Sequence, residues 1–169
     1  MGERLLPRDL NELFAHALAV EREATKRFAE LEGYMRQQGM DYIADEFQSI
    51  GREEREQYEA LAVGTAGREL PQLSAWEYAA HFLGPQADVV IAPRNVREAL
   101  ALAIASERRA QNFYVDVAEH TSDDTMCAFA AEMAVDEGRH IARLERLLAR
   151  EPEAAAPGAA GADVLPLKP

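Results

Sequence analysis

One pair of residues combines a carboxylate and an imidazole at a spacing that suits metal chemistry. Glu137 and His140 lie three residues apart in the stretch MAVDEGRHIARLERLL, so a helix places both side chains on one face. The same face carries Ile141 and Leu144, which a helix normally buries. A buried carboxylate beside a buried imidazole indicates a shared partner, and both groups are ligands that divalent metals accept.

Three further glutamates occupy the centres of similar apolar stripes. Glu21 and Glu107 each interrupt a run of apolar residues that recur at alternating spacings of four and three. Glu54 holds the corresponding place in a third run, and Glu137 in a fourth. The pattern predicts four amphipathic helices, each with one carboxylate on its buried face. The four stripes cover residues 10–31, 47–61, 96–117 and 130–144.

The chain reads as a duplicated helical hairpin. Between Glu21 and Glu107 the numbering differs by 86, and between Glu54 and Glu137 by 83. The neighbouring apolar positions keep the same offsets, so the difference falls in the hairpin turn. The residue three after the glutamate is Gln57 in the first copy and His140 in the second.

Caps and helix breakers predict an all-α fold. Asp9 with Glu12, and Asn95 with Glu98, have the spacing of a helix N-cap and its partner. Two antiparallel hairpins joined by a long crossover give a four-helix bundle over residues 1–150. The expected helices cover about 9–38, 41–63, 95–120 and 122–150, the crossover covers 64–93 with a short helix in AWEYAAHFL, and 151–169 forms a flexible tail.

Four carboxylates in one core need a source of positive charge. A buried ionised carboxylate without a partner is costly and tends to take up a proton. No lysine or arginine occupies the inward-facing positions of these stripes, and two divalent cations balance four negative charges. The alternative is a metal-free bundle in which Gln57 and His140 hydrogen-bond to partly protonated glutamates.

The sequence resembles the ferritin-like superfamily, closest to its rubrerythrin-like branch, over residues 9–150. The resemblance lies in AVEREATKRF (19–28), EREQYEAL (54–61), AIASERRAQNFY (103–114) and EGRHIARL (137–144). It implies a ferritin-like bundle that binds two iron ions, with manganese as the alternative metal. The implied terminal ligands are Glu21 and Glu107, the bridging ligands are Glu54 and Glu137, and His140 completes one metal. The chain departs from the family at Gln57, where a second histidine is expected, which predicts a weak or empty second position.

Composition restricts the partners. The net charge of −12 argues against nucleic acid, whose phosphates repel an acidic surface. A single cysteine cannot form a rubredoxin-type iron site, so reduction needs an external electron donor. No segment is long and apolar enough to span a membrane, and we expect a cytoplasmic homodimer.

The C-terminal DVLPLKP after an Ala/Gly-rich linker is similar in build to encapsulin docking peptides, although a disordered tail is the simpler interpretation.

These features leave three functions open. The first is a di-metal protein with redox activity toward oxygen, peroxide or ferrous iron, of peroxidase or ferroxidase type. The second is a non-enzymatic protein that binds or handles iron, and the third is a metal-free scaffold. Outside the ligand set, His16 is expected at the surface or an interface. His81 is expected to have a packing role, with substrate gating or an interface as the alternatives, and Tyr114 is expected to pack in the core, with electron relay as the alternative.

Overall fold

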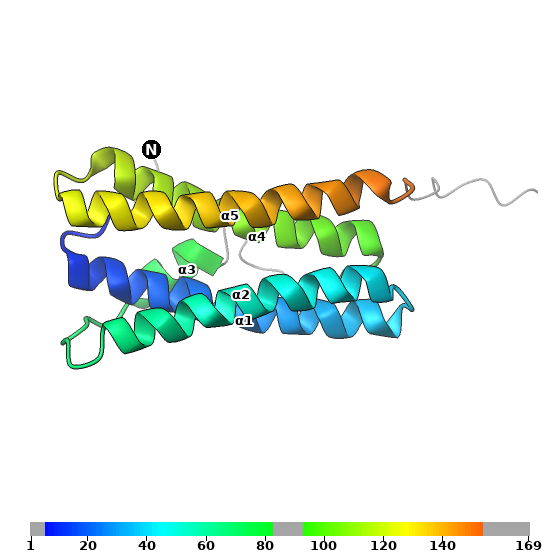
Figure 1. Cartoon of the computed structure of the whole chain (residues 1–169), viewed down its shortest axis with the longest axis horizontal. Coiled ribbons are helices and arrows are strands. Elements are labelled where there is room, and N and C mark those ends of the chain that lie inside the picture. The colour runs from blue at the N-terminus through cyan, green and yellow to red at the C-terminus, as the bar shows by residue number, and fades with distance from the viewer. Residues whose placement is uncertain (1–5, 83–92, 154–169) are drawn as a thin grey trace, which may run out of the picture.

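The computed structural model describes residues 6–82 and 93–153, and these form helices joined by short connections. The order is α1 (Leu10–Gln37), α2 (Asp41–Gly64), α3 (Ala75–Phe82), α4 (Val96–His120) and α5 (Asp124–Arg150). Helices α1 and α2 form one antiparallel hairpin and α4 and α5 the other, and the hairpins lie side by side (Figure 1). This confirms the predicted all-α four-helix bundle.

The helix boundaries follow from local chemistry. The side chains of Asp9 and Asn95 accept hydrogen bonds from the backbone N–H groups of Glu12 and Glu98, each at 2.9 Å. These bonds satisfy donors that the first turn of a helix leaves without partners. The α1–α2 turn contains Gly39 at φ 70°, a left-handed conformation that glycine adopts without strain.

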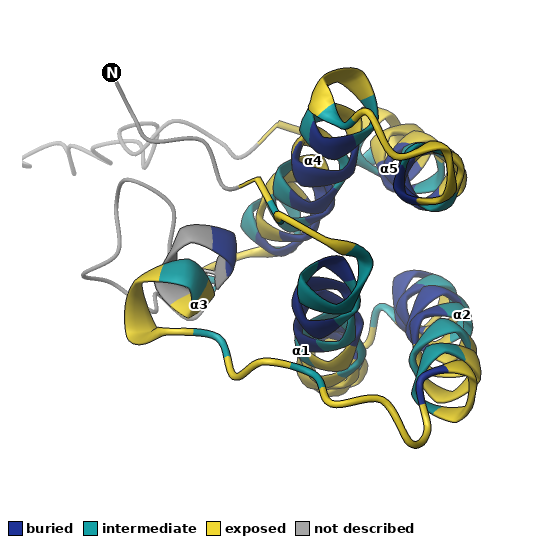
Figure 2. Cartoon of the chain, turned by 90° about the vertical axis from the view of Figure 1, so that its left-hand side faces the viewer, coloured by how far each residue is buried: buried dark blue, intermediate teal, exposed yellow. Residues whose placement is uncertain are grey.

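Helix α3 lies within the connection between the hairpins and packs beside α1 and α4. Viewed along the bundle, the buried faces of the four long helices point toward one another, and α3 flanks α1 and α4 on one side (Figure 2). The predicted flexible C-terminal tail covers residues 151–169, of which 154–169 lie outside the described part of the chain. No described helix combines the length and apolarity needed to cross a membrane.

The apolar core consists of two separate clusters, one toward each end of the bundle. The first is built around Phe28, Phe47 and Leu144, and the second around Leu13 and Tyr114. In α1, α4 and α5 the clusters meet at the position of the central glutamate, and in α2 the first cluster ends just before it. The bundle therefore interrupts its own hydrocarbon core with a polar layer.

Candidate metal centre

The polar layer between the two clusters contains the central glutamate of each long helix. Glu21 lies on α1, Glu54 on α2, Glu107 on α4, and Glu137 with His140 on α5. All five side chains are buried, with exposed fractions between 0% and 2%. Charged residues are rarely buried to this degree unless they are paired or bind a metal.

His140 lies at the centre of the layer. Its Nδ1 is 3.2 Å from Oε2 of Glu107 and 3.9 Å from Oε2 of Glu137. Oε1 of Glu54 is 2.7 Å from the same nitrogen, although without the alignment that a hydrogen bond needs. One ligand atom from each of these four residues lies within 4.8 Å of the other three. This group could hold a metal ion.

Glu21 and Gln57 lie outside that group of four. The hydroxyl of the fully buried Tyr114 donates a 2.7 Å hydrogen bond to Oε1 of Glu21. Gln57 is half-buried, and its Nε2 donates a 3.0 Å hydrogen bond to Oδ2 of Asp136. The structure therefore brings together four of the six predicted ligands, while Tyr114 holds Glu21 and Asp136 holds Gln57.

Several oxygens in this layer have no hydrogen-bond partner. A buried carboxylate oxygen left without a donor costs free energy, because it has lost its water and gained nothing in exchange. Hard oxygen atoms of this kind suit ferrous and manganous ions, and an imidazole nitrogen completes such a donor set. The donor chemistry fits a pair of divalent cations. The unpartnered atoms are Oε2 of Glu21, both carboxylate oxygens of Glu54, Oε1 of Gln57 and Oε2 of Glu137.

Burial and mutual repulsion raise the affinity of the layer for protons. Burial, followed by the charge of Glu54, raises the pKa of Glu21 well above its ordinary value. Burial also raises the pKa of Glu107 and that of Glu137, and for Glu137 the next cause is the charge of Glu107. Burial opposes the charged form of His140, but the carboxylates of Glu107 and Glu54 outweigh it and raise its pKa to about 10. Cations that bind here must displace these protons.

Two acidic residues outside the predicted set hold the side chains of the layer in place. Oε2 of Glu53 is 3.1 Å from Nε2 of His140, and Nη1 of Arg143 donates a 2.6 Å hydrogen bond to Oε1 of Glu53. Asp136 accepts the hydrogen bond from Gln57. Both acids directly precede a predicted bridging glutamate, one in each copy of the duplicated hairpin. That repeated position is the signal that could have identified them.

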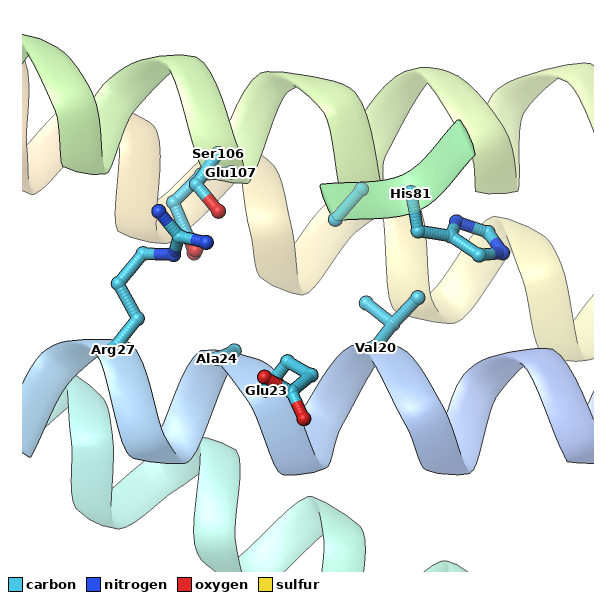
Figure 3. A pocket seen from close by; sticks show the side chains of 8 residues that line it. Val20, Glu23, Ala24, Arg27, His81, Ser106 and Glu107 are labelled. Carbon is cyan, nitrogen blue, oxygen red and sulfur yellow. The ribbon is translucent and has the colours of Figure 1, made fainter. Parts of the chain in front are cut away.

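Solvent approaches the layer from two sides. A pocket between α1 and α4 reaches Glu107, and Arg27 extends into it from α1 (Figure 3). A second groove, between α2 and α5, leads to Gln57 and His140. Glu107 therefore borders the pocket on one side of the layer, and His140 borders the groove on the other. The pocket is lined by Val20, Glu23, Ala24, Arg27, His81, Ser106, Glu107 and Ala110, and the groove by Glu53, Glu56, Gln57, Ala60, Asp136, Arg139 and His140.

The prediction that His16 lies at the surface or an interface is wrong. His16 is 1% exposed, because α3 folds over it and places His81 against it, with 2.8 Å between Nδ1 of His16 and Nε2 of His81. Phe113 packs edge-on against the ring of His81, as the predicted packing role requires. Burial and the adjacent His16 lower the pKa of His81 to about 3, so His81 is uncharged at neutral pH.

Comparison with known proteins identifies the family. A family model described as Rubrerythrin matches residues 12–148. The chain belongs to the rubrerythrin family. This confirms the predicted resemblance, and membership of the rubrerythrin family together with the buried Glu/His group indicates a di-iron carboxylate protein.

A solved structure supports the same fold. The chain is similar to the crystal structure of an uncharacterised conserved protein from Magnetospirillum magnetotacticum, with a TM-score of 0.75 and 24% sequence identity. The match covers 88% of this chain and 99% of that protein. At this identity the likeness shows the fold alone. The search of curated proteins finds no match to this chain.

Proposed function

We propose that this rubrerythrin-family chain binds two iron ions, with manganese as the alternative, and acts on oxygen, peroxide or ferrous iron. The observation that carries the proposal is the group of buried carboxylates around Nδ1 of His140, in a layer where several carboxylate oxygens have no hydrogen-bond donor. Two bound ferrous ions would supply the two electrons that, with two protons, convert hydrogen peroxide into two molecules of water. The proposed terminal ligands are Glu21 and Glu107, the proposed bridging ligands are Glu54 and Glu137, and His140 and Gln57 complete the two positions.

The surrounding residues prepare the site for cations. When Nε2–H of His140 donates to Glu53, the Nδ1 lone pair faces the carboxylate cluster. A carboxylate behind a metal-binding histidine fixes the orientation of the ring and increases its basicity. Tyr114 likewise holds one oxygen of Glu21 and leaves the other free for a metal. The apolar clusters enclose the layer along the axis of the bundle.

Protons and electrons need separate sources. In the metal-free protein, burial and neighbouring charges raise the pKa of Glu21 and of Glu137, and metal binding displaces any protons that these carboxyls hold. Repeated turnover needs an electron donor, and the single cysteine of this sequence cannot form a rubredoxin-type iron site. The proposed donor is a reduced protein or a small-molecule reductant.

A second candidate function is non-enzymatic metal binding. Gln57 supports it, because a neutral amide oxygen stands where the family motif has a basic imidazole. Such a ligand holds an ion more weakly, so one position can be filled while the other stays empty. A bundle that stores or transfers single ferrous ions would tolerate this asymmetry, whereas two-electron chemistry needs both ions together.

The two candidates separate in an anaerobic stopped-flow experiment. The protein is loaded with ferrous iron, freed of excess metal and mixed with hydrogen peroxide or with oxygenated buffer. The redox proposal predicts fast oxidation of two ferrous ions per peroxide in the wild type, loss of this reaction in Glu137→Ala, and no change in the exposed control Glu59→Gln. Iron that loads but oxidises no faster than free ferrous iron supports non-enzymatic handling. Absence of loading leaves a metal-free scaffold.

A further inference from the structure

The hydrogen bonds behind the metal-binding side chains repeat across the two halves of the bundle. The residues preceding the central glutamates, Glu53 and Asp136, occupy equivalent places in the duplicated hairpin, as do Gln57 and His140. Glu53 of α2 reaches across to Nε2 of His140 on α5 at 3.1 Å. Asp136 of α5 reaches back to Nε2 of Gln57 on α2 at 3.0 Å. Each hairpin thus orients the ligand side chain of the other.

An arginine on α5 holds each of these acids. Nη1 of Arg143 donates to Glu53 at 2.6 Å, and Nη1 of Arg139 donates to Oδ1 of Asp136 at 2.5 Å. Each carboxylate therefore uses one oxygen for its arginine and the other for the ligand side chain of the opposite hairpin. The carboxylate contacts of Gln57 and His140 therefore correspond, although Arg143 reaches Glu53 from the opposite hairpin whereas Arg139 lies three residues after Asp136 on the same helix.

This arrangement determines which way the amide of Gln57 points. An ionised carboxylate accepts hydrogen bonds and donates none, so the NH2 group of Gln57 must face Asp136. The carbonyl Oε1 then lies on the opposite side, where it is inaccessible to solvent and has no hydrogen-bond partner. An imidazole that donates Nε2–H to a carboxylate presents Nδ1 on its opposite side. Gln57 likewise presents Oε1 on the side opposite its carboxylate partner, Asp136.

We propose that Asp136 is a positioning residue that fixes Oε1 of Gln57 as a metal ligand and makes the second metal position an exchangeable, all-oxygen site. This inference rests on the proposed function. The first position receives an imidazole nitrogen from His140, whereas the second receives Glu21, the bridging carboxylates and a neutral amide oxygen. Oxygen-only sites favour hard ions such as Mn²⁺ and Mg²⁺ and lack the affinity that an imidazole adds for later transition metals.

A path for exchange reaches both positions. The groove between α2 and α5 is lined by Gln57 and by His140, together with three carboxylates and Arg139. Its carboxylates attract cations from solvent. The difference between the two positions lies in their ligands, because the neutral amide of Gln57 holds an ion more weakly than the imidazole of His140. An ion at the second position is therefore the last to load and the first to leave, while the ion beside His140 stays bound.

The test is a titration of the metal-free chain with Mn²⁺, in which the electron paramagnetic resonance signal counts free Mn²⁺. The wild type should bind one ion tightly and a second more weakly. Asp136→Asn places at position 136 an amide that both donates and accepts hydrogen bonds, so either the oxygen or the NH2 group of Gln57 can face it. The substitution should weaken binding of the second ion about 10-fold or more and leave binding of the first ion unchanged. Glu53→Gln is the matched control and should weaken the first ion instead. Asp136→Glu should restore much of the second affinity.

Three further results keep the inference falsifiable. Gln57→Leu should abolish the second ion, and Gln57→His should tighten it. The thermal midpoint of each metal-free variant shows that the bundle remains folded. If Asp136→Asn leaves the second affinity unchanged, or if Gln57→Leu still binds two ions, the inference is overturned while the two-metal proposal stands. If the wild type binds no Mn²⁺ and no Fe²⁺, the proposed function itself fails.

Discussion

Metal-free protein should lose stability as the pH rises from about 7 to about 9, because folded His140 keeps a proton that the unfolded chain gives up. The carboxylates of Glu107 and Glu54 overcome the effect of burial and raise its pKa from 6.5 to about 10. A raised pKa means that the stabilisation is complete below pH 6.5 and is lost as the pH rises through 10. One proton held only in the folded state gives a slope of about 1.4 kcal/mol per pH unit, hence about 3 kcal/mol over this interval. The same principle gives the same sign for the raised pKa values of Glu21 and Glu137.

Thermal unfolding followed by circular dichroism in EDTA measures this slope. A loss of about 3 kcal/mol corresponds to a fall of roughly 6–12 °C in the midpoint for a domain of this size. His140→Gln removes the titrating group and should flatten the slope, whereas the exposed control His120→Gln should not. Added Mn²⁺ should reverse the trend, because ligands bind metal in their deprotonated forms. A midpoint that stays constant or rises in the metal-free wild type would refute the reasoning.

Three substitutions test the packing around the layer by urea unfolding of metal-free protein. Tyr114→Phe removes the hydrogen bond to Glu21 and should cost about 1–3 kcal/mol; an unchanged midpoint would show that this bond contributes nothing. Leu144→Ala empties a fully buried site and should cost about 2–5 kcal/mol, and a smaller loss would mean that the first core cluster collapses around the gap. Gly51→Ala places a Cβ 3.0 Å from Cβ of Phe28 and should cost about 1–3 kcal/mol through overpacking, which a neutral or stabilising result would contradict.

The bundle could be predicted from sequence because each helix repeats the same simple pattern. Apolar spacing and caps at Asp9 and Asn95 depend only on residues within one helix, and the structure shows the same capping bonds. The duplication allowed a weak Glu-x-x-His motif to be weighed together with Glu21, Glu54 and Glu107. Four carboxylates at equivalent buried positions point to a common site, which no single helix could indicate.

The contacts between helices could not be predicted in this way. His16 lies one residue from the Leu13–Ala17 stripe, which predicts a place at the surface or an interface, but α3 covers it from a distant part of the chain. Glu53 and Asp136 each lie one residue from a central glutamate, so a helical pattern directs them toward solvent. Their roles depend on how α2 approaches α5, and helix periodicity carries no information about that approach.

Metal content per chain tests the central claim most directly. The protein is purified without chelators, loaded anaerobically with ferrous iron, desalted and measured by elemental analysis against protein concentration. The account predicts close to two irons per chain after brief desalting, and fewer in Glu54→Ala and Glu137→Ala, which remove the proposed bridging ligands. A folded helical protein that retains neither iron nor manganese would contradict it and would leave the glutamates as a protonated polar layer.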